Sequence, residues 1–324
     1  MGLTRLAVLA LMTFAIAAGA GLAVAQDSKA DASQQLLNAV FKGDLASVRI
    51  LLDNGANTEA QDANGLTPLI MAAENNDIAI VKLLLAKGAN VSTKDRRGET
   101  AMIAAARCGN SEIVTLLLEK TSSAREKKRA LFAAIHGSGI VIPEASDNAN
   151  NIPANQTNHP RPELPHMPWV RTVSLLVKKG VPIEARDEDG STTLISAATY
   201  AATDIVTFLL KKGADTQATD KYGNTALIAA ACECALATMN STYDIAKMLL
   251  NEGVDPNVRN HEGTTALMNA ASGFGDAAIV KLLIESGADP TAKDKHGNTA
   301  LALAIKRQRP DKVRLLKRAM AQTH

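Results

Sequence analysis

One phrase returns along the chain at intervals near 33 residues, and it limits the fold more than any other feature. "DANGLTPLIMAA" (62–73) is followed by "DRRGETAMIAAA" (95–106), and versions of it begin again at residues 187, 220, 260 and 294. A second phrase lies between the copies, as in "DIAIVKLLLAKGAN" (77–90) and "AIVKLLIESGADP" (278–290). Repetition of whole phrases at this period is typical of a solenoid, in which each unit packs on its neighbours.

Each phrase has a local structural interpretation. Asp-x-x-Gly predicts a turn, since Gly accepts a positive φ, and the Thr two residues later predicts the N-cap of a short Ala-rich helix. The second phrase places Ile, Val and Leu at helical spacing and stops at a Gly, which is typical of a helix C-terminus. One such pair cannot bury its own apolar face, so the sequence predicts an all-α repeat.

The two phrases resemble the ankyrin repeat, whose consensus joins D-x-x-G-x-T-P-L-H-x-A-A to I-V-K-L-L-L-x-x-G-A-D. The resemblance covers nearly all of residues 34–324, although Pro68 is the only consensus proline retained and Ile, Met or Ala replaces the consensus His. It implies an ankyrin solenoid of about eight helix pairs with β-hairpin-like turns. It also implies binding of another protein through the concave face formed by those turns and the first helices.

Two segments interrupt the period. Residues 138–169, which include "NHPRPELPHMPW", hold six of the eleven prolines and are expected to form an inserted loop in the fourth repeat. This loop would separate helices at "RALFAAIHG" (129–137) and "VRTVSLLVKKGVP" (170–182). A smaller insertion is expected at 232–241 in the sixth repeat. Both lie between the first and second helices of their repeats, so we expect them on one edge of the stack.

The ends of the chain carry their own signals. Residues 1–25 place Arg5 before an apolar run that ends in Ala23-Val24-Ala25, which predicts a secretory signal peptide; an uncleaved anchor is the alternative. Residues 26–33 would form a short linker. We expect export to a periplasm, with secretion as the alternative, and a monomer without a membrane span after cleavage. At the other end, "KRQRPDKVRLLKRAM" (306–320) is charged enough for a solvent-facing cap.

Composition argues against several function classes. Lys plus Arg number 35 against 33 Asp plus Glu, and aromatic residues are 3%, so nothing indicates nucleic-acid binding. No nucleophile elbow, His-Glu-x-x-His motif or phosphate-binding loop occurs outside the repeat phrases. We therefore expect no enzyme activity, no catalytic residue, no cofactor and no resident metal.

The insertions nevertheless contain residues that could carry chemistry. His159, Glu163 and His166 have ligand-like spacing, but the prolines around them exclude the helix that would hold them on one face. Cys108, Cys232 and Cys234 do not have the spacing of a disulfide framework, and Cys-x-Cys alone is a weak metal or redox signal. Trp169 has two interpretations: it contacts a partner, or it fixes the loop onto the stack.

The ankyrin resemblance implies where a partner would bind. The expected contact positions on the turns are Arg96, Arg97, Glu99, Glu188, Asp189, Lys221, Tyr222, His261, Glu262, Lys295 and His296, and those on the first helices are Met71, Glu74, Asn75, Thr199, Tyr200 and Asn269. Tyr200 and Tyr222 stand out because aromatic side chains are favoured interface anchors. Three functions follow as hypotheses: an exported scaffold or inhibitor, a host-directed effector, and a metal- or redox-linked envelope function.

Overall fold

The computed structural model describes residues 31–121, 123–138, 167–232, 239–275 and 277–322. Within these residues the chain is helical, with one isolated antiparallel bridge between Arg186 and Thr192 and no strand. This confirms an all-α repeat. The predicted signal peptide, the central part of the long insertion and Cys234 lie outside the described residues.

The described residues form two compact units, and the first comprises residues up to Ala105 together with Glu119–Thr121. A helix over residues 31–41 pairs in sequence with α2 (Leu45–Asp53), and α3 (Pro68–Glu74) packs against α4 (Ile78–Ala86). Helix α5 (Ala101–Arg107) begins in this unit, and its last two residues belong to the second.

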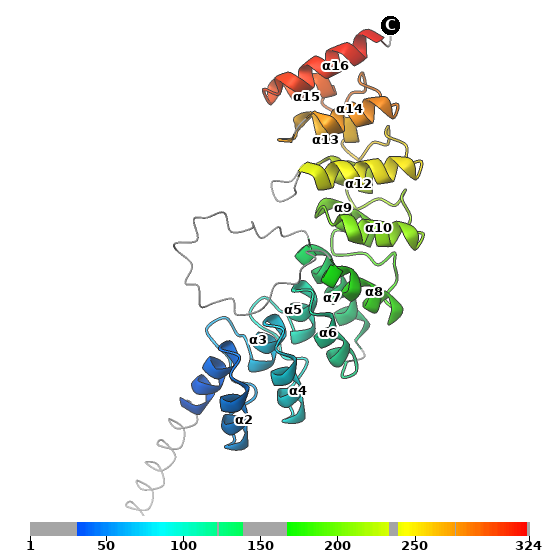
Figure 1. Cartoon of the computed structure of the whole chain (residues 1–324). Helices are drawn as coiled ribbons and strands as arrows, with labels where there is room; N and C mark the ends of the chain where they lie inside the picture. Colours follow the sequence, from blue (N-terminus) through cyan, green and yellow to red (C-terminus); the bar gives the residue numbers. More distant parts are fainter. Residues whose placement is uncertain (1–30, 122, 139–166, 233–238, 276, 323–324) are drawn as a thin grey trace, which may run out of the picture. The chain divides into compact units, whose positions relative to one another are not determined.

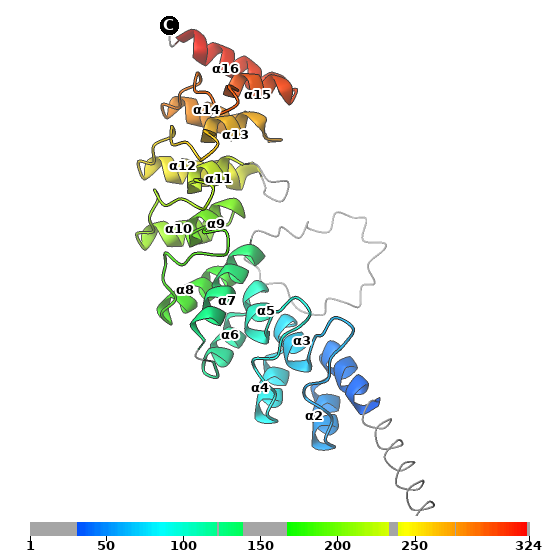
Figure 2. The same cartoon turned by 180° about the vertical axis from the view of Figure 1, so that it is seen from behind.

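The second unit is a stack of helix pairs, each of which packs on the next (Figure 1). After α6 (Ser111–Leu118), the pairs are α7 (Ala124–Ser138) with α8 (Met167–Lys178), α9 (Thr193–Thr199) with α10 (Thr203–Lys211), α11 (Ala226–Ala231) with α12 (Met239–Asn251), α13 (Ala266–Ser272) with α14 (Ala278–Glu285), and α15 (Ala300–Lys306) with α16 (Pro310–Gln322). Figure 2 shows the stack from behind, with α11 beside α12.

The core of the stack is made of small side chains on the first helices and branched ones on the second helices. In α11 the side chains of Ala226, Ala230 and Ala231 are buried, and in α12 those of Ile245 and Leu249 are. Alanine lets adjacent first helices approach closely, whereas Ile and Leu fill the space between second helices. The hydrophobic period of the sequence predicted this division.

The turns before the first helices, which we call fingers, follow the predicted chemistry. They comprise residues 62–67, 95–100, 187–192, 220–225, 260–265 and 294–299. Gly223 has a φ of 79°, and a Cβ built there would lie 2.8 Å from the backbone N of His261 in the next finger. Thr225 Oγ1 accepts a hydrogen bond from Ile228 N, 3.4 Å away, as the expected N-cap. Gly in this finger therefore serves both the turn and close stacking.

The fourth repeat has no finger, and its first helix is longer than predicted. We expected its first helix at 129–137, but α7 extends from Ala124 to Ser138 and places a helical turn where other repeats carry Asp-x-x-Gly. Ser123 Oγ accepts a hydrogen bond from Glu126 N at 3.2 Å and so caps the longer helix. The repeat therefore enters its first helix directly.

Three predicted boundaries also need correction. The helix at residues 31–41 begins inside the segment 26–33 expected to be a linker, since Asp31 accepts a hydrogen bond from Gln35 Nε2 at 2.8 Å within its first turn. Ser138 and residues 167–169, placed in the loop 138–169, are helical. Residues 239–241, placed in the insertion 232–241, belong to α12, whose first turns bury Thr242.

The two helices that flank the long insertion meet at the carbonyl of Arg107. Trp169 Nε1, in the first turn of α8, donates to Arg107 O at 2.9 Å. Gly137, near the end of α7, lies so close that an added Cβ would be 1.9 Å from the same oxygen. We call Arg107, Gly137 and Trp169 the indole clamp. It agrees with the interpretation of Trp169 as a residue that fixes the insertion to the stack.

The last helix contains a buried cation that the sequence interpretation missed. Counting from Leu316, Lys312 occupies the position of Ile279 in α14, and its side chain is 2% exposed. Its Nζ donates to Ala270 O at 2.7 Å and Gly273 O at 3.2 Å, at the end of α13. The charges of 306–320 are thus not all solvent-facing, because an ammonium at a helix C-terminus satisfies carbonyls that the helix leaves unpaired.

None of the helices in the described ranges is both long and apolar enough to cross a membrane.

Candidate protein-binding surface

Each finger of the second unit is built around one acidic or amide side chain. Asp220 Oδ1 accepts hydrogen bonds from the backbone N–H groups of Tyr222 and Asn224, both at 2.8 Å. Equivalent bonds are made by Asp187, Asn260 and Asp294. This side chain fixes the turn locally, so the two residues between it and the Gly project from the tip.

Backbone hydrogen bonds join the tips of successive fingers. Lys221 N donates to Asp189 O at 3.1 Å, His261 N to Tyr222 O at 2.9 Å, and Lys295 N to Glu262 O at 2.9 Å. The four fingers between residues 187 and 299 are therefore linked tip to tip, and we call them the finger row. Its backbone is ordered before any partner binds, which lowers the entropy cost of binding.

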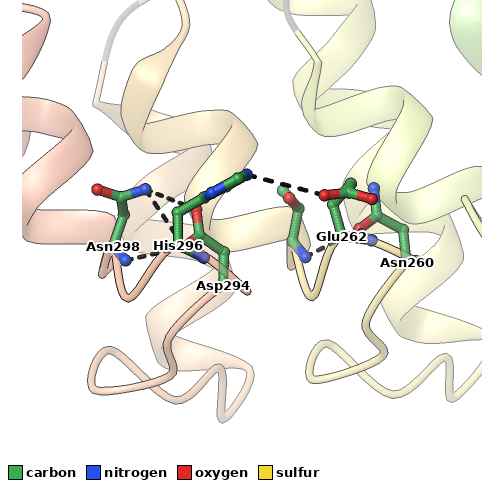
Figure 3. Close-up of polar contacts among 6 residues, drawn as sticks. Asn260, Glu262, Asp294, His296 and Asn298 are labelled. Atoms are coloured by element: carbon green, nitrogen blue, oxygen red, sulfur yellow. Dashed lines mark hydrogen bonds and ion pairs between the residues drawn. The ribbon is translucent and has the colours of Figure 1, made fainter.

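One ion pair and one polar contact also join the side chains of neighbouring tips. Lys221 Nζ forms an ion pair with Asp189 Oδ1, and this hydrogen bond is the main reason that the pKa of Lys221 is raised. His296 Nε2 lies 3.8 Å from Glu262 Oε2 (Figure 3). These four residues were expected to contact a partner, but the charges of Lys221 and Asp189 are compensated within the row.

The base of the last finger is an anionic turn held by hydrogen bonds. Asn298 Nδ2 donates to Asp294 Oδ2 at 2.9 Å, and His296 N donates to Asp294 Oδ1 at 2.9 Å (Figure 3). Burial of Asp294 opposes its ionisation, but these hydrogen bonds outweigh that effect and lower its pKa. The carboxylate is thus committed to the turn, and the residues that project from it, Lys295 and His296, are exposed.

Tyr222 is the aromatic side chain that the finger row presents to solvent. It is 54% exposed, and Lys221 Nζ lies 5.0 Å from the centre of its ring. Lys221 is itself held by Asp189 of the preceding finger, so the ring is positioned through two fingers. The other expected tip residues of the finger row are exposed as well; they are Glu188, Asp189, Lys221, His261, Glu262, Lys295 and His296.

Two of the first-helix candidates of the second unit, Tyr200 and Asn269, are less available than expected. Tyr200 is half-buried and stacks on His136, with 4.3 Å between ring centres. Burial lowers the pKa of His136, and the charge of Asp187 opposes this effect in part. Asn269 Nδ2 donates to Ile228 O at 3.2 Å, which connects α13 to α11. Tyr200 and Asn269 therefore make contacts within the stack.

In the first unit the expected residues fall on one finger, residues 95–100, and on α3 with its C-cap. Arg96 N donates to Asn64 O at 3.1 Å, and Arg97 Nε lies 3.5 Å from Asp95 Oδ2. Both arginine side chains are exposed, whereas Met71 and Glu74 on α3 are half-buried. The structure thus brings Arg96 and Arg97 to one finger tip.

Several contacts between repeats were missed by sequence reasoning. Arg186 Nη1 donates to Thr219 O at 2.6 Å, and Arg259 Nη1 donates to Lys293 O at 3.0 Å. Each Arg directly precedes the Asp or Asn that opens a finger, and this shared place is the signal in the sequence. His136 carried no such signal, since its partner Tyr200 is 64 positions away (200 − 136).

The structure describes only some of the candidate residues for metal or redox chemistry. His159, Glu163, His166 and Cys234 lie outside the described residues. Cys108 is half-buried and Cys232 is exposed. Among the residues that the structure describes, no group of three His, Cys, Asp or Glu side chains could hold a metal ion.

Comparison with protein families gives one match, to ankyrin repeats (3 copies), over residues 36–139, 170–239 and 234–323. The unmatched internal segment, 140–169, falls within the predicted insertion. A comparison with curated proteins gave no match. Ankyrin repeats generally mediate protein–protein interaction and are generally non-enzymatic scaffolds.

Proposed function

Because this chain belongs to the ankyrin-repeat family, we propose that it is an exported protein-binding module that uses the finger row of its second unit. Its role would be that of a scaffold, inhibitor or regulator of an envelope or secreted protein. Export rests on the sequence of residues 1–25, which is typical of a cleaved signal peptide.

The observation that supports the finger row as the binding site is the position of Tyr222. An aromatic ring that is 54% exposed and held by a charged neighbour fits the description of an interface anchor. The same finger row exposes Glu188, His261 and Lys295, so it presents charges of both signs that would select a partner by electrostatic complementarity. Tyr200 is assigned to the stack instead, since it packs on His136.

Two other functions remain as alternatives. A host-directed effector would use the same surface and differ in where the protein is delivered. A metal- or redox-linked envelope function would depend on His159, His166, Cys232 and Cys234. The effector and scaffold hypotheses are separated by finding the partner, and the metal hypothesis by metal analysis of the dialysed protein.

A pull-down from envelope extracts with residues 26–324 as bait tests the proposal, and Tyr222→Ala and Phe274→Ala separate the surfaces. Phe274 is 74% exposed but lies in the link between α13 and α14, so it is the matched control. Loss of an aromatic anchor is expected to weaken partner binding by about 1–2 kcal/mol for Tyr222→Ala. Phe274→Ala should bind as the original protein does.

The opposite pattern, with binding lost in Phe274→Ala and kept in Tyr222→Ala, would contradict the finger row as the site. Export is tested separately by cell fractionation and N-terminal sequencing, which should find a mature chain that starts at Gln26. A full-length cytoplasmic protein would remove the envelope partner from consideration.

A further inference from the structure

The fourth repeat, which has no finger, forms a hollow that is lined by cationic side chains. The hollow has a volume of about 470 Å³ and lies between the N-terminal turn of α7 and the segment that follows α8. Four cationic side chains line the hollow: those of Arg125, Lys127, Lys128 and Lys179. Ala124, Gly180, Val181 and Pro182 complete its lining. No carboxylate lines the hollow.

The charge of this hollow is not balanced by ion pairs. None of its four cations has a salt-bridge partner in the part of the chain that the structure describes. Lys87 provides the contrast: it precedes Gly88 as Lys179 precedes Gly180, and its Nζ lies 2.7 Å from Asp53 Oδ1. The equivalent cation is therefore neutralised in the second repeat and not in the fourth.

The carboxylates nearest in sequence, those of Glu126 and Glu184, are not among the residues that line the hollow. Glu126 belongs to the capped first turn of α7 and does not line the hollow. Glu184 Oε1 accepts a hydrogen bond from Asp215 N of the next repeat at 2.9 Å. The positive end of the α7 helix dipole adds to the field of the four side chains. Like charges gathered in one place repel one another, so an anion bound there would relieve this repulsion.

We propose that this hollow binds a multivalent oxyanion of the phosphate type, with the lysines and Arg125 as hydrogen-bond donors. Several charge-assisted hydrogen bonds from side chains of the first turns of α7 and of the turn after α8 suit a phosphate or diphosphate group, which offers many acceptor oxygens. The group would come from a soluble phosphate compound or from the headgroup of an anionic lipid. The site is separate from the finger row and does not depend on the proposed protein partner.

Calorimetric titration of the full chain with pyrophosphate at low, constant ionic strength tests the proposal, because salt screens such sites. The test variant is Lys127→Gln/Lys128→Gln/Lys179→Gln. The control is Lys211→Gln/Lys212→Gln/Lys247→Gln, which removes the same charge from exposed lysines of α10, its C-cap and α12. The test variant should bind pyrophosphate at least about tenfold more weakly, whereas the control should bind like the original protein.

A second measurement protects against a folding artefact and identifies the source of the phosphate. Pyrophosphate should raise the thermal midpoint of the original chain and of the control, but not that of the test variant. Co-sedimentation with vesicles of phosphatidylglycerol and phosphatidylcholine, lost in the test variant and competed by pyrophosphate, would assign the headgroup as the source; no sedimentation would assign a soluble phosphate. Equal losses in both variants, or no pyrophosphate binding by the original chain, would overturn the site.

Discussion

Replacement of Lys312 by Met is expected to destabilise the C-terminal repeat by about 2 kcal/mol, because it removes a buried cation that caps α13. Its two hydrogen bonds, at 2.7 and 3.2 Å, go from an ammonium to carbonyl oxygens. Such bonds are each worth about 1.5–3 kcal/mol, and the longer one contributes less. Met keeps the aliphatic stem buried, and removal of the charge recovers part of its desolvation cost, so the net loss is smaller than the sum.

Lys312→Ala should cost more, about 3–4 kcal/mol, because the stem is lost as well. Lys317→Met is the matched control, since Lys317 is exposed on the same helix. The loss should be local, because a terminal repeat contacts only its neighbour. Urea denaturation gives the free energy, and hydrogen exchange should show faster exchange in α15 and α16. If Lys312→Met matches the control by both methods, the ammonium does not cap α13 and the reasoning fails.

Two further predictions concern the base of the insertion. In Gly137→Ala the added methyl carbon would lie 1.9 Å from Arg107 O, which is a severe clash. The free energy of unfolding in urea titrations should therefore fall by about 2–4 kcal/mol. A variant as stable as the original would mean that α7 shifts freely to relieve the clash. His136 has a lowered pKa in the folded protein, so the unfolded chain takes up its proton first as the pH falls. The stabilisation present above about pH 6.5 should therefore decline as the pH falls below that value, and His136→Asn should show a weaker decline in the same titration. An equal decline in both proteins would exclude His136 as a source of acid sensitivity.

The finger and helix positions were predictable because they depend on local chemistry. Gly223 predicted a turn residue with a positive φ and Thr225 predicted a helix N-cap, and the structure has both. The start of α7 was also encoded, since Ser123 and Glu126 have the spacing of a capping box that the interpretation overlooked. Local sequence signals were thus sufficient to predict the positions of the fingers and the starts of the helices.

The side-chain contacts across the stack were less predictable. The pair Asp189–Lys221 spans nearly one period, so the repeat spacing brings its members to adjacent fingers. Tyr200, by contrast, was expected to face a partner, and its contact with His136 crosses the insertion. The repeat period does not predict this contact, because the fold of the two repeats does not fix how many residues are inserted between His136 and Tyr200.

The indole clamp has a consequence for protein engineering. Trp169 and Gly137 both lie against one carbonyl, that of Arg107, so the helices before and after the insertion are held at the same place on the stack. A foreign peptide of any length grafted between them would start and end at positions set by the clamp and not by its own sequence.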